Sequence, residues 1–196
     1  MDIVLEKLGK SFNGKLVFEN LSLTFAEGRT SCLTGSSGCG KTSVLDIIAG
    51  ISPADSGRVL GTEGRKMAYV FQEPRLLPWK TVLQNVEFVL PPEMSPEEKE
   101  RRGMECLAIV ELEAEASEFP AELSRGMAQR VSLARALAAD ADILLLDEPF
   151  SGIDAALKER ISARLGHIWS ERRTTVILVS HSEEDAGGAD VSFRLR

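Results

Sequence analysis

The fold of this chain is decided by one stretch of sequence, Gly35-Ser36-Ser37-Gly38-Cys39-Gly40-Lys41-Thr42. An apolar run leads into it from Thr30 to Thr34, and an apolar-periodic run leads out of it from Val44 to Ala49, so we expect a strand, a glycine-rich turn and a helix. Glycines let successive backbone N–H groups point at phosphate oxygens, and the helix directs the positive end of its dipole at the same anion. This context predicts a phosphate-binding loop rather than a chance glycine turn.

The residues of this loop have separate predicted roles. Lys41 supplies a positive charge for the β- and γ-phosphates of a nucleotide, and the Thr42 hydroxyl can be a ligand of Mg²⁺. The other predicted nucleotide contacts lie in the turn or at the start of the following helix: Gly35, Ser36, Ser37, Gly38, Cys39, Gly40 and Ser43. The loop therefore predicts a bound nucleotide accompanied by magnesium.

Composition and charge limit the class of protein. At 196 residues and 43% hydrophobic content the chain can bury one sizeable core, which predicts a single α/β domain with at most one subdomain. The net charge of −7 argues against a general affinity for nucleic acid or anionic lipid. No apolar run approaches the roughly 18 residues of a membrane span, and the first residues do not resemble a signal peptide. Because the three cysteines are scattered, they suit a reducing cytosol, and we expect any membrane connection to run through a partner.

The rest of the chain alternates between strand and helix patterns. Strands are expected at 3–8, 21–25, 58–60, 67–71, 143–146, 174–179 and 191–196, and helices after the phosphate loop, over 82–89, from 95, from 124 and over 154–172. Asn13-Gly14 predicts the turn between the first two strands. This order predicts a mostly parallel α/β fold with an N-terminal antiparallel β part and a helical insertion between Thr81 and Arg130.

Polar side chains follow the predicted buried strands. Asp147 and Glu148 come directly after the apolar run Ile143–Leu146, and open α/β sheets bind ligands at the carboxyl ends of their strands. Asp147 can hold Mg²⁺, and Glu148 can orient and deprotonate a water that attacks the γ-phosphate. His181 follows the next buried strand, where it can be a structural histidine or can contact the γ-phosphate. Gln72 has a comparable place after the strand at 67–71.

Together these motifs resemble those of the ATP-binding subunits of ABC transporters, and the resemblance covers essentially the whole chain. The matching segments are Gly35–Thr42 for Walker A, Gln72 for the Q-loop, Leu123–Gln129 for the signature, Ile143–Glu148 for Walker B, Ser151–Asp154 for the D-loop and His181 for the switch histidine. The resemblance implies one ABC ATPase domain over 1–196, with a nucleotide-binding P-loop NTPase core at 1–72 and 131–196. The helical subdomain with the signature motif would then be 73–130.

The resemblance also implies a division of labour within the site. Catalysis would rest on Glu148, His181 and Gln72, and the magnesium ligands would be Thr42, Gln72 and Asp147. Phe12 is open to two interpretations, since an apolar aromatic is usually buried in a core. The resemblance instead matches Phe12 to the aromatic position that stacks on adenine.

The partners follow from the same resemblance. It implies a head-to-tail homodimer with two ATP molecules between the subunits, each held by the phosphate loop of one chain and by Ser124 and Gly126 of the other, with Asp154 beside the nucleotide. Closure and hydrolysis would drive separate permease subunits at the cytoplasmic face of the membrane, and a solute-binding protein would deliver the solute. Arg125 replaces a usual glycine of the signature, and Met127 stands where glutamine is common.

The stretch Val70–Trp79 most resembles the nitrate, sulfonate and taurine importer branch, with pyrimidine importers for thiamine synthesis as an alternative. A rival from another class is a soluble ABC-type ATPase, such as an iron–sulfur assembly factor. A second rival is a regulatory copy with weak activity, which only Arg125 suggests.

Overall fold

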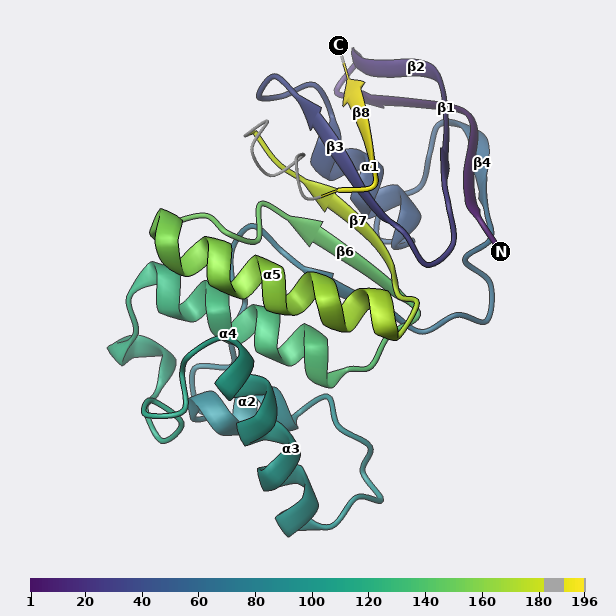
Figure 1. Ribbon diagram of the computed structural model, residues 1–196. Coiled ribbons are helices and arrows are strands. Elements are labelled where there is room, and N and C mark those ends of the chain that lie inside the picture. Colours follow the sequence, from purple (N-terminus) through teal and green to yellow (C-terminus); the bar gives the residue numbers. More distant parts are fainter. Residues whose placement is uncertain (182–188, 196) are drawn as a thin grey trace. The chain divides into compact units, whose positions relative to one another are not determined.

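The computed structural model describes residues 1–181 and 189–195. Internal contacts divide the chain into two units, which we describe separately (Figure 1). The first unit contains Met1–Tyr69, Asp142–Glu148 and Trp169–Arg196. The second contains Val70–Ala141 and Pro149–Ile168.

The first unit begins with an antiparallel sheet. Its strands are β1 (Ile3–Phe12), β2 (Lys15–Phe25) and β4 (Ser56–Leu60), in the order β2-β1-β4. The hairpin between β1 and β2 turns at Asn13 and Gly14, whose φ angles are 51° and 77°. Positive φ at both central residues is the geometry for which Asn-Gly is suited, so the predicted turn is confirmed.

A second sheet of the first unit contains the strands that lead to the predicted site. They are β3 (Thr30–Gly35), β5 (Met67–Val70), β6 (Ile143–Asp147), β7 (Thr175–Val179) and β8 (Val191–Leu195), in the order β5-β6-β7-β3-β8. β3 pairs in parallel with both β7 and β8, and β6 pairs in parallel with β7. Every residue of β6 and β7 is buried, as their uninterrupted apolar runs predict. The predicted α/β class is confirmed.

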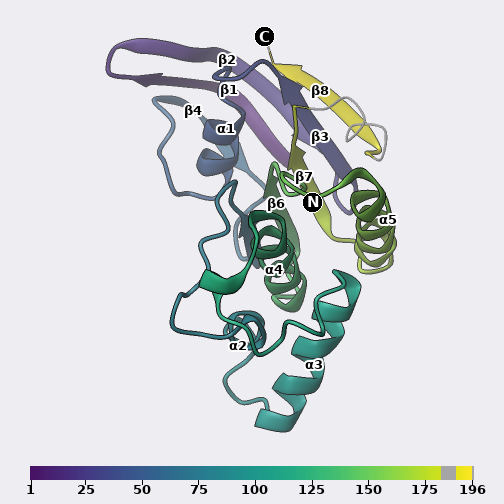
Figure 2. The same cartoon turned by 90° about the vertical axis from the view of Figure 1, so that its left-hand side faces the viewer.

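Helix α1 (Lys41–Ile48) follows the phosphate loop and lies between the two sheets (Figure 2). Its apolar face carries Val44 and Leu45, which pack in one cluster with Leu5 of β1 and Leu145 of β6. All four side chains are essentially inaccessible to solvent. Because α1 is packed on both sides, its N-terminus and the loop before it have a defined position in the unit.

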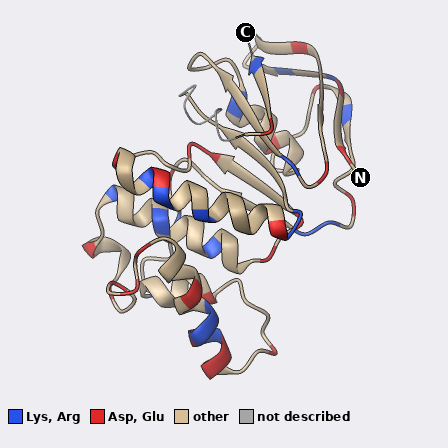
Figure 3. Cartoon of the chain, in the orientation of Figure 1, with Lys and Arg blue, Asp and Glu red and all other residues tan. Residues whose placement is uncertain are grey.

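The second unit is helical. Its elements are α2 (Val82–Glu87), α3 (Pro96–Ile109), a short 3₁₀ turn at Pro120–Glu122, α4 (Arg125–Ala138) and the greater part of α5 (Ala155–Glu171). The Thr81, Ser95 and Ser124 side chains each accept a backbone N–H bond and so cap α2, α3 and α4. Charges of both signs line α3 (Figure 3), and its residues Glu97, Glu98, Glu100 and Arg101 are exposed, which agrees with a solvated face. None of the helices in the described ranges is long and apolar enough to cross a bilayer.

Candidate functional site

The phosphate loop owes its shape to glycines at crowded positions. Gly35 and Gly40 have φ angles of 152° and 97°. A Cβ at Gly35 would lie 2.7 Å from the carbonyl oxygen of Leu195, and one at Gly40 would lie 2.6 Å from a methyl group of Val17. Only glycine fits this backbone without displacing β8 or the side chains of β2, so the loop can turn closely around a phosphate.

Lys41, the first residue of α1, is buried although it carries a charge. Its Nζ donates hydrogen bonds to the carbonyl oxygens of Gly35 and Ser36, both at 2.9 Å. The same nitrogen lies 4.0 Å from the Cys39 sulfur and 3.5 Å from Nδ1 of His181. The ammonium group is thus held over the loop, where it can contact a phosphate oxygen.

Thr42 and Asp147 meet at the junction of α1 and β6. The Thr42 hydroxyl donates a 2.8 Å hydrogen bond to Oδ2 of Asp147, which is 3% exposed. Burial raises the pKa of the Asp147 carboxyl; the hydrogen bond from Thr42 opposes this shift, and the charges of Glu148 and Asp46 add to it. The oxygen atoms of the buried Asp147 carboxylate and the exposed Thr42 hydroxyl lie side by side, which provides a place for a hard cation that solvent can reach.

These donors fit Mg²⁺, an ion that proteins usually hold by one or two carboxylates while water and substrate phosphates complete its shell. Among residues 1–181 and 189–195 no group of three His, Cys, Asp or Glu side chains could hold a metal ion. A magnesium ion at Thr42 and Asp147 would take its other ligands from water and from phosphate oxygens.

Glu148 and His181 lie together beyond the ends of β6 and β7. Oε1 of Glu148 is 2.5 Å from Nε2 of His181. The backbone N–H of Glu148 donates to the carbonyl oxygen of Val179 at 3.0 Å, and its φ angle is 49°. Since Lys41 lies beside the other ring nitrogen of His181, the structure brings together the lysine, carboxylate and histidine that the sequence predicted at one edge of the sheet.

The remaining predicted site residues of the helical unit lie at turns and helix starts. Oγ of Ser124 accepts the N–H of Met127 at 3.3 Å, and Oδ1 of Asp154 accepts that of Leu157 at 3.0 Å. A Cβ at Gly126 would lie 2.4 Å from the carbonyl oxygen of Gly152, so the signature and the D-loop are in close contact within this unit. Gln72 and Arg125 are both exposed.

Phe12 ends β1 and is 48% exposed, so its interpretation as a plain core residue is wrong. Nζ of Lys10 lies 5.0 Å from the centre of its ring. Sequence reasoning missed Lys10, because a single lysine in a strand gives no sign of its partners.

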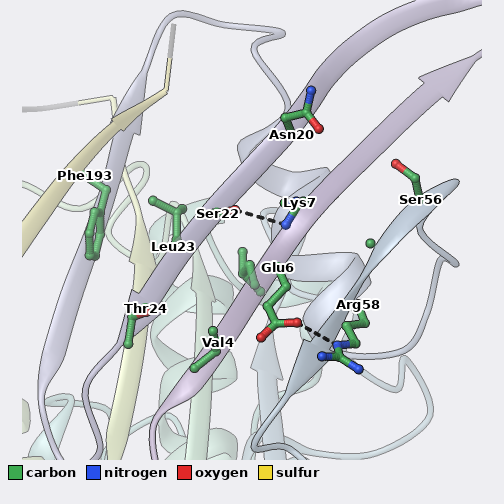
Figure 4. Close-up of a pocket in the computed structure, with 12 residues that line it drawn as sticks. Val4, Glu6, Lys7, Asn20, Ser22, Leu23, Thr24, Ser56, Arg58 and Phe193 are labelled. Carbon is green, nitrogen blue, oxygen red and sulfur yellow. Dashed lines mark hydrogen bonds and ion pairs between the residues drawn. The ribbon is translucent and has the colours of Figure 1, made fainter.

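A separate hollow of about 920 Å³ lies on the antiparallel sheet (Figure 4). It is lined by Val4, Leu5, Glu6, Lys7, Asn20, Ser22, Leu23, Thr24, Ser56, Gly57, Arg58 and Phe193. An ion pair of 2.7 Å joins Glu6 to Arg58 there. No residue of the phosphate loop lines this hollow, so its size does not make it the nucleotide site.

The parallel sheet, the phosphate loop and the carboxylates at the strand ends define an α/β P-loop nucleotide-binding protein. Comparison with protein-family models matches residues 18–151 to the family described as ABC transporter. The chain belongs to this family.

Curated relatives agree with this assignment. The chain is 37% identical over 186 residues to the aliphatic sulfonates import ATP-binding protein of Shouchella clausii, covering 95% of this chain and 73% of the relative. It is 40% identical to the bicarbonate transport ATP-binding protein of Synechocystis sp., covering 87% of this chain and 64% of the relative. The sulfate/thiosulfate import ATP-binding protein of Halalkalibacterium halodurans is 38% identical, over 100% of this chain and 58% of the relative.

Solved structures show the same fold. A dimeric ATP-binding cassette in a post-hydrolysis state, bound to ADP and Pi, superposes with a TM-score of 0.91 at 31% identity and covers 99% of this chain and 94% of that one. A dimeric bacterial ABC transporter cassette gives a TM-score of 0.89 at 31% identity, covering 98% and 94%. The predicted ABC ATPase fold is confirmed.

Proposed function

We propose that this chain is the ATP-binding and ATP-hydrolysing subunit of an ABC importer. The observation that carries the proposal is the set of contacts around the phosphate loop: Lys41 to His181 at 3.5 Å, His181 to Glu148 at 2.5 Å, and Thr42 to Asp147 at 2.8 Å. The similarity to import ATP-binding proteins supports an importer rather than a soluble ATPase of the same fold.

The geometry accounts for hydrolysis in terms of this chain's own groups. Lys41 exchanges its bonds to the loop carbonyls for phosphate oxygens, while backbone N–H groups of the loop bind the same phosphates. Thr42 and Asp147 would hold Mg²⁺, which neutralises developing phosphate charge when bound. Glu148 accepts the proton of the attacking water, and His181, 2.5 Å away, holds that carboxylate in place. Gln72 is proposed as a further contact of the magnesium and the water.

The complete site is proposed to need a second copy of the chain. Both solved cassettes named above are dimers, and Ser124 and Arg125 are exposed at the start of α4. In the proposed homodimer, N–H groups at Ser124 and Gly126 of one subunit bind the γ-phosphate held by the other, and Asp154 lies beside the same nucleotide. ATP would then close the dimer and its hydrolysis would open it.

The proposed permease contact lies on the helical subdomain, for which we propose the boundaries 73–130; the nucleotide-binding core would then be 1–72 and 131–196. A groove of about 390 Å³ is lined by Lys80, Gln84, Glu87, Phe88, Leu90, Pro92 and Lys99. Trp79 and Phe88 are 71% and 61% exposed, although large apolar side chains are usually covered. We propose that a helix of a membrane subunit covers them and that the chain works at the cytoplasmic face of the membrane. A separate binding protein would deliver a solute of the sulfonate, nitrate or taurine kind, or a thiamine precursor.

ATP turnover with and without the permease subunits tests this function. We expect the parent chain to hydrolyse MgATP, faster with its permease, and Glu148→Gln to bind ATP without turning it over. Glu159→Gln is the matched control, because Glu159 is an exposed carboxylate on α5 outside the site. Turnover that no permease subunit changes would support a soluble ATPase, and absence of ATP binding by the parent would refute the proposal.

A further inference from the structure

Lys10 is a buried lysine whose partners lie far away in the sequence. Its residue is 7% exposed, and its Nζ donates a 2.7 Å hydrogen bond to the carbonyl oxygen of Pro53 and lies 3.5 Å from Oδ1 of Asp55. Burial of an ammonium group is costly unless it is paired and hydrogen-bonded. The loop after α1 supplies both kinds of partner, so Lys10 has one defined position.

Asp55 connects the same loop to the end of β1 by further bonds. Its Oδ2 accepts the N–H of Ser11 at 2.7 Å, and its own N–H donates to the carbonyl oxygen of Gly9 at 2.9 Å. The backbone on both sides of Lys10 is therefore bonded to one aspartate. The next residue after Ser11 is Phe12. The bonds of Asp55 to Gly9 and Ser11 therefore fix the end of β1 that carries the exposed ring.

The ammonium group of Lys10 also contacts that ring directly, 5.0 Å from its centre. A cation at this distance is attracted by the π electrons of the ring and favours one ring orientation. Since Phe12 remains 48% exposed, ring surface is left for a ligand.

We propose that Lys10, held by Pro53 and Asp55, is a positioning residue for the nucleobase, because it orients Phe12 as the platform on which adenine stacks. The inference rests on the proposed function, since it requires ATP at the phosphate loop. A positioning role and a purely structural role of Lys10 predict different effects on binding. A positioning residue changes the affinity of ligands that carry a base, whereas a residue that only holds the loop changes the affinity of every ligand of the site or of none.

The test compares ATP with inorganic triphosphate, which carries the phosphates without a base. Dissociation constants are measured by calorimetry for the parent, Lys10→Met, Phe12→Ala and the double variant. We expect Lys10→Met to weaken ATP by about 3- to 30-fold, the range of a cation–π contact, and to leave triphosphate unchanged. In the Phe12→Ala background, Lys10→Met should change ATP binding by less than about 2-fold. Lys66→Met, at an exposed lysine of the same unit outside the site, is the matched control and should change nothing.

Three results would overturn the proposal: unchanged ATP binding by Lys10→Met, an equal loss for ATP and triphosphate, or an equal loss with and without Phe12. Failure of the parent to bind either ligand would refute the proposed function instead. Thermal melting shows whether Lys10→Met is folded. If it is not folded, Asp55→Asn replaces it, because this variant keeps an acceptor for Ser11 and removes the charge opposite Lys10. Asp55→Asn must then weaken ATP, leave triphosphate unchanged and have little effect in the Phe12→Ala background.

Discussion

Gly126 cannot be replaced by alanine without moving the D-loop, and the cost of this movement follows from the structure. The new Cβ would lie 2.4 Å from the carbonyl oxygen of Gly152, whereas ordinary contacts begin at 3.4 Å, so one backbone must shift by about 1 Å. Overpacking of this kind costs about 1–3 kcal/mol, and the better helix propensity of alanine returns at most about 1 kcal/mol. We expect a net loss of about 1–2 kcal/mol.

For a chain of this length that loss corresponds to a melting temperature lower by about 2–8 °C. The assay is thermal unfolding without nucleotide, where dimer closure by ATP does not contribute. Gly166→Ala is the matched control on α5: apart from its chain neighbours and the backbone of its own helix, no atom lies within 4 Å of the new Cβ, so it should match or exceed the parent in stability. A Gly126→Ala protein that melts at or above the parent temperature would refute the reasoning about the contact between signature and D-loop.

Glu148→Gln keeps the shape of the side chain but removes the base, so ATP should bind, persist and stabilise a dimer detectable by light scattering; rapid turnover would exclude Glu148 as the base. Asp147→Asn should stabilise the nucleotide-free protein at neutral pH, because burial raises the pKa of Asp147 and its ionised form is costly. In a pH series, the melting temperature of Asp147→Asn should exceed that of the parent by less and less as pH falls through the raised pKa, because the parent carboxyl becomes neutral there. A difference in melting temperature that does not change with pH would contradict this explanation. Arg125 is exposed, so Arg125→Gly should leave ATP-driven dimerisation and its salt dependence unchanged, whereas a flatter salt dependence would indicate pairing with phosphate.

Local patterns predicted the elements and the composition of one half of the site. The glycine spacing before Lys41, followed by a helix pattern, is typical of a phosphate-binding loop. The apolar run of β6 ends where Asp147 and Glu148 begin. Because parallel strands end at the same edge, the sequence also predicted that His181 lies near these groups. The roles assigned to these residues stay predictions.

Contacts between distant residues could not be predicted in this way. Neither the ion pair of Lys10 with Asp55 nor the contact of Gly126 with Gly152 follows from hydrophobic periodicity, since each depends on how two separate segments pack against each other. The ion pairs of Glu111 with Arg160 and Arg164 join the end of α3 to α5 in the same manner. The usual burial of aromatic residues also gave a wrong prediction for Phe12, because an average over all phenylalanines does not describe a residue at the end of a hairpin strand.

The backbone of Glu148 has an evolutionary consequence. Its φ of 49° lies in the left-handed region, which costs a residue with a side chain about 1–3 kcal/mol and costs glycine almost nothing. Selection for stability alone would therefore favour glycine or asparagine at this position, and the proposed role of Glu148 in hydrolysis would explain why a glutamate is retained. A descendant of this chain that no longer needed to hydrolyse ATP would be expected to lose Glu148 early and to gain stability when it did.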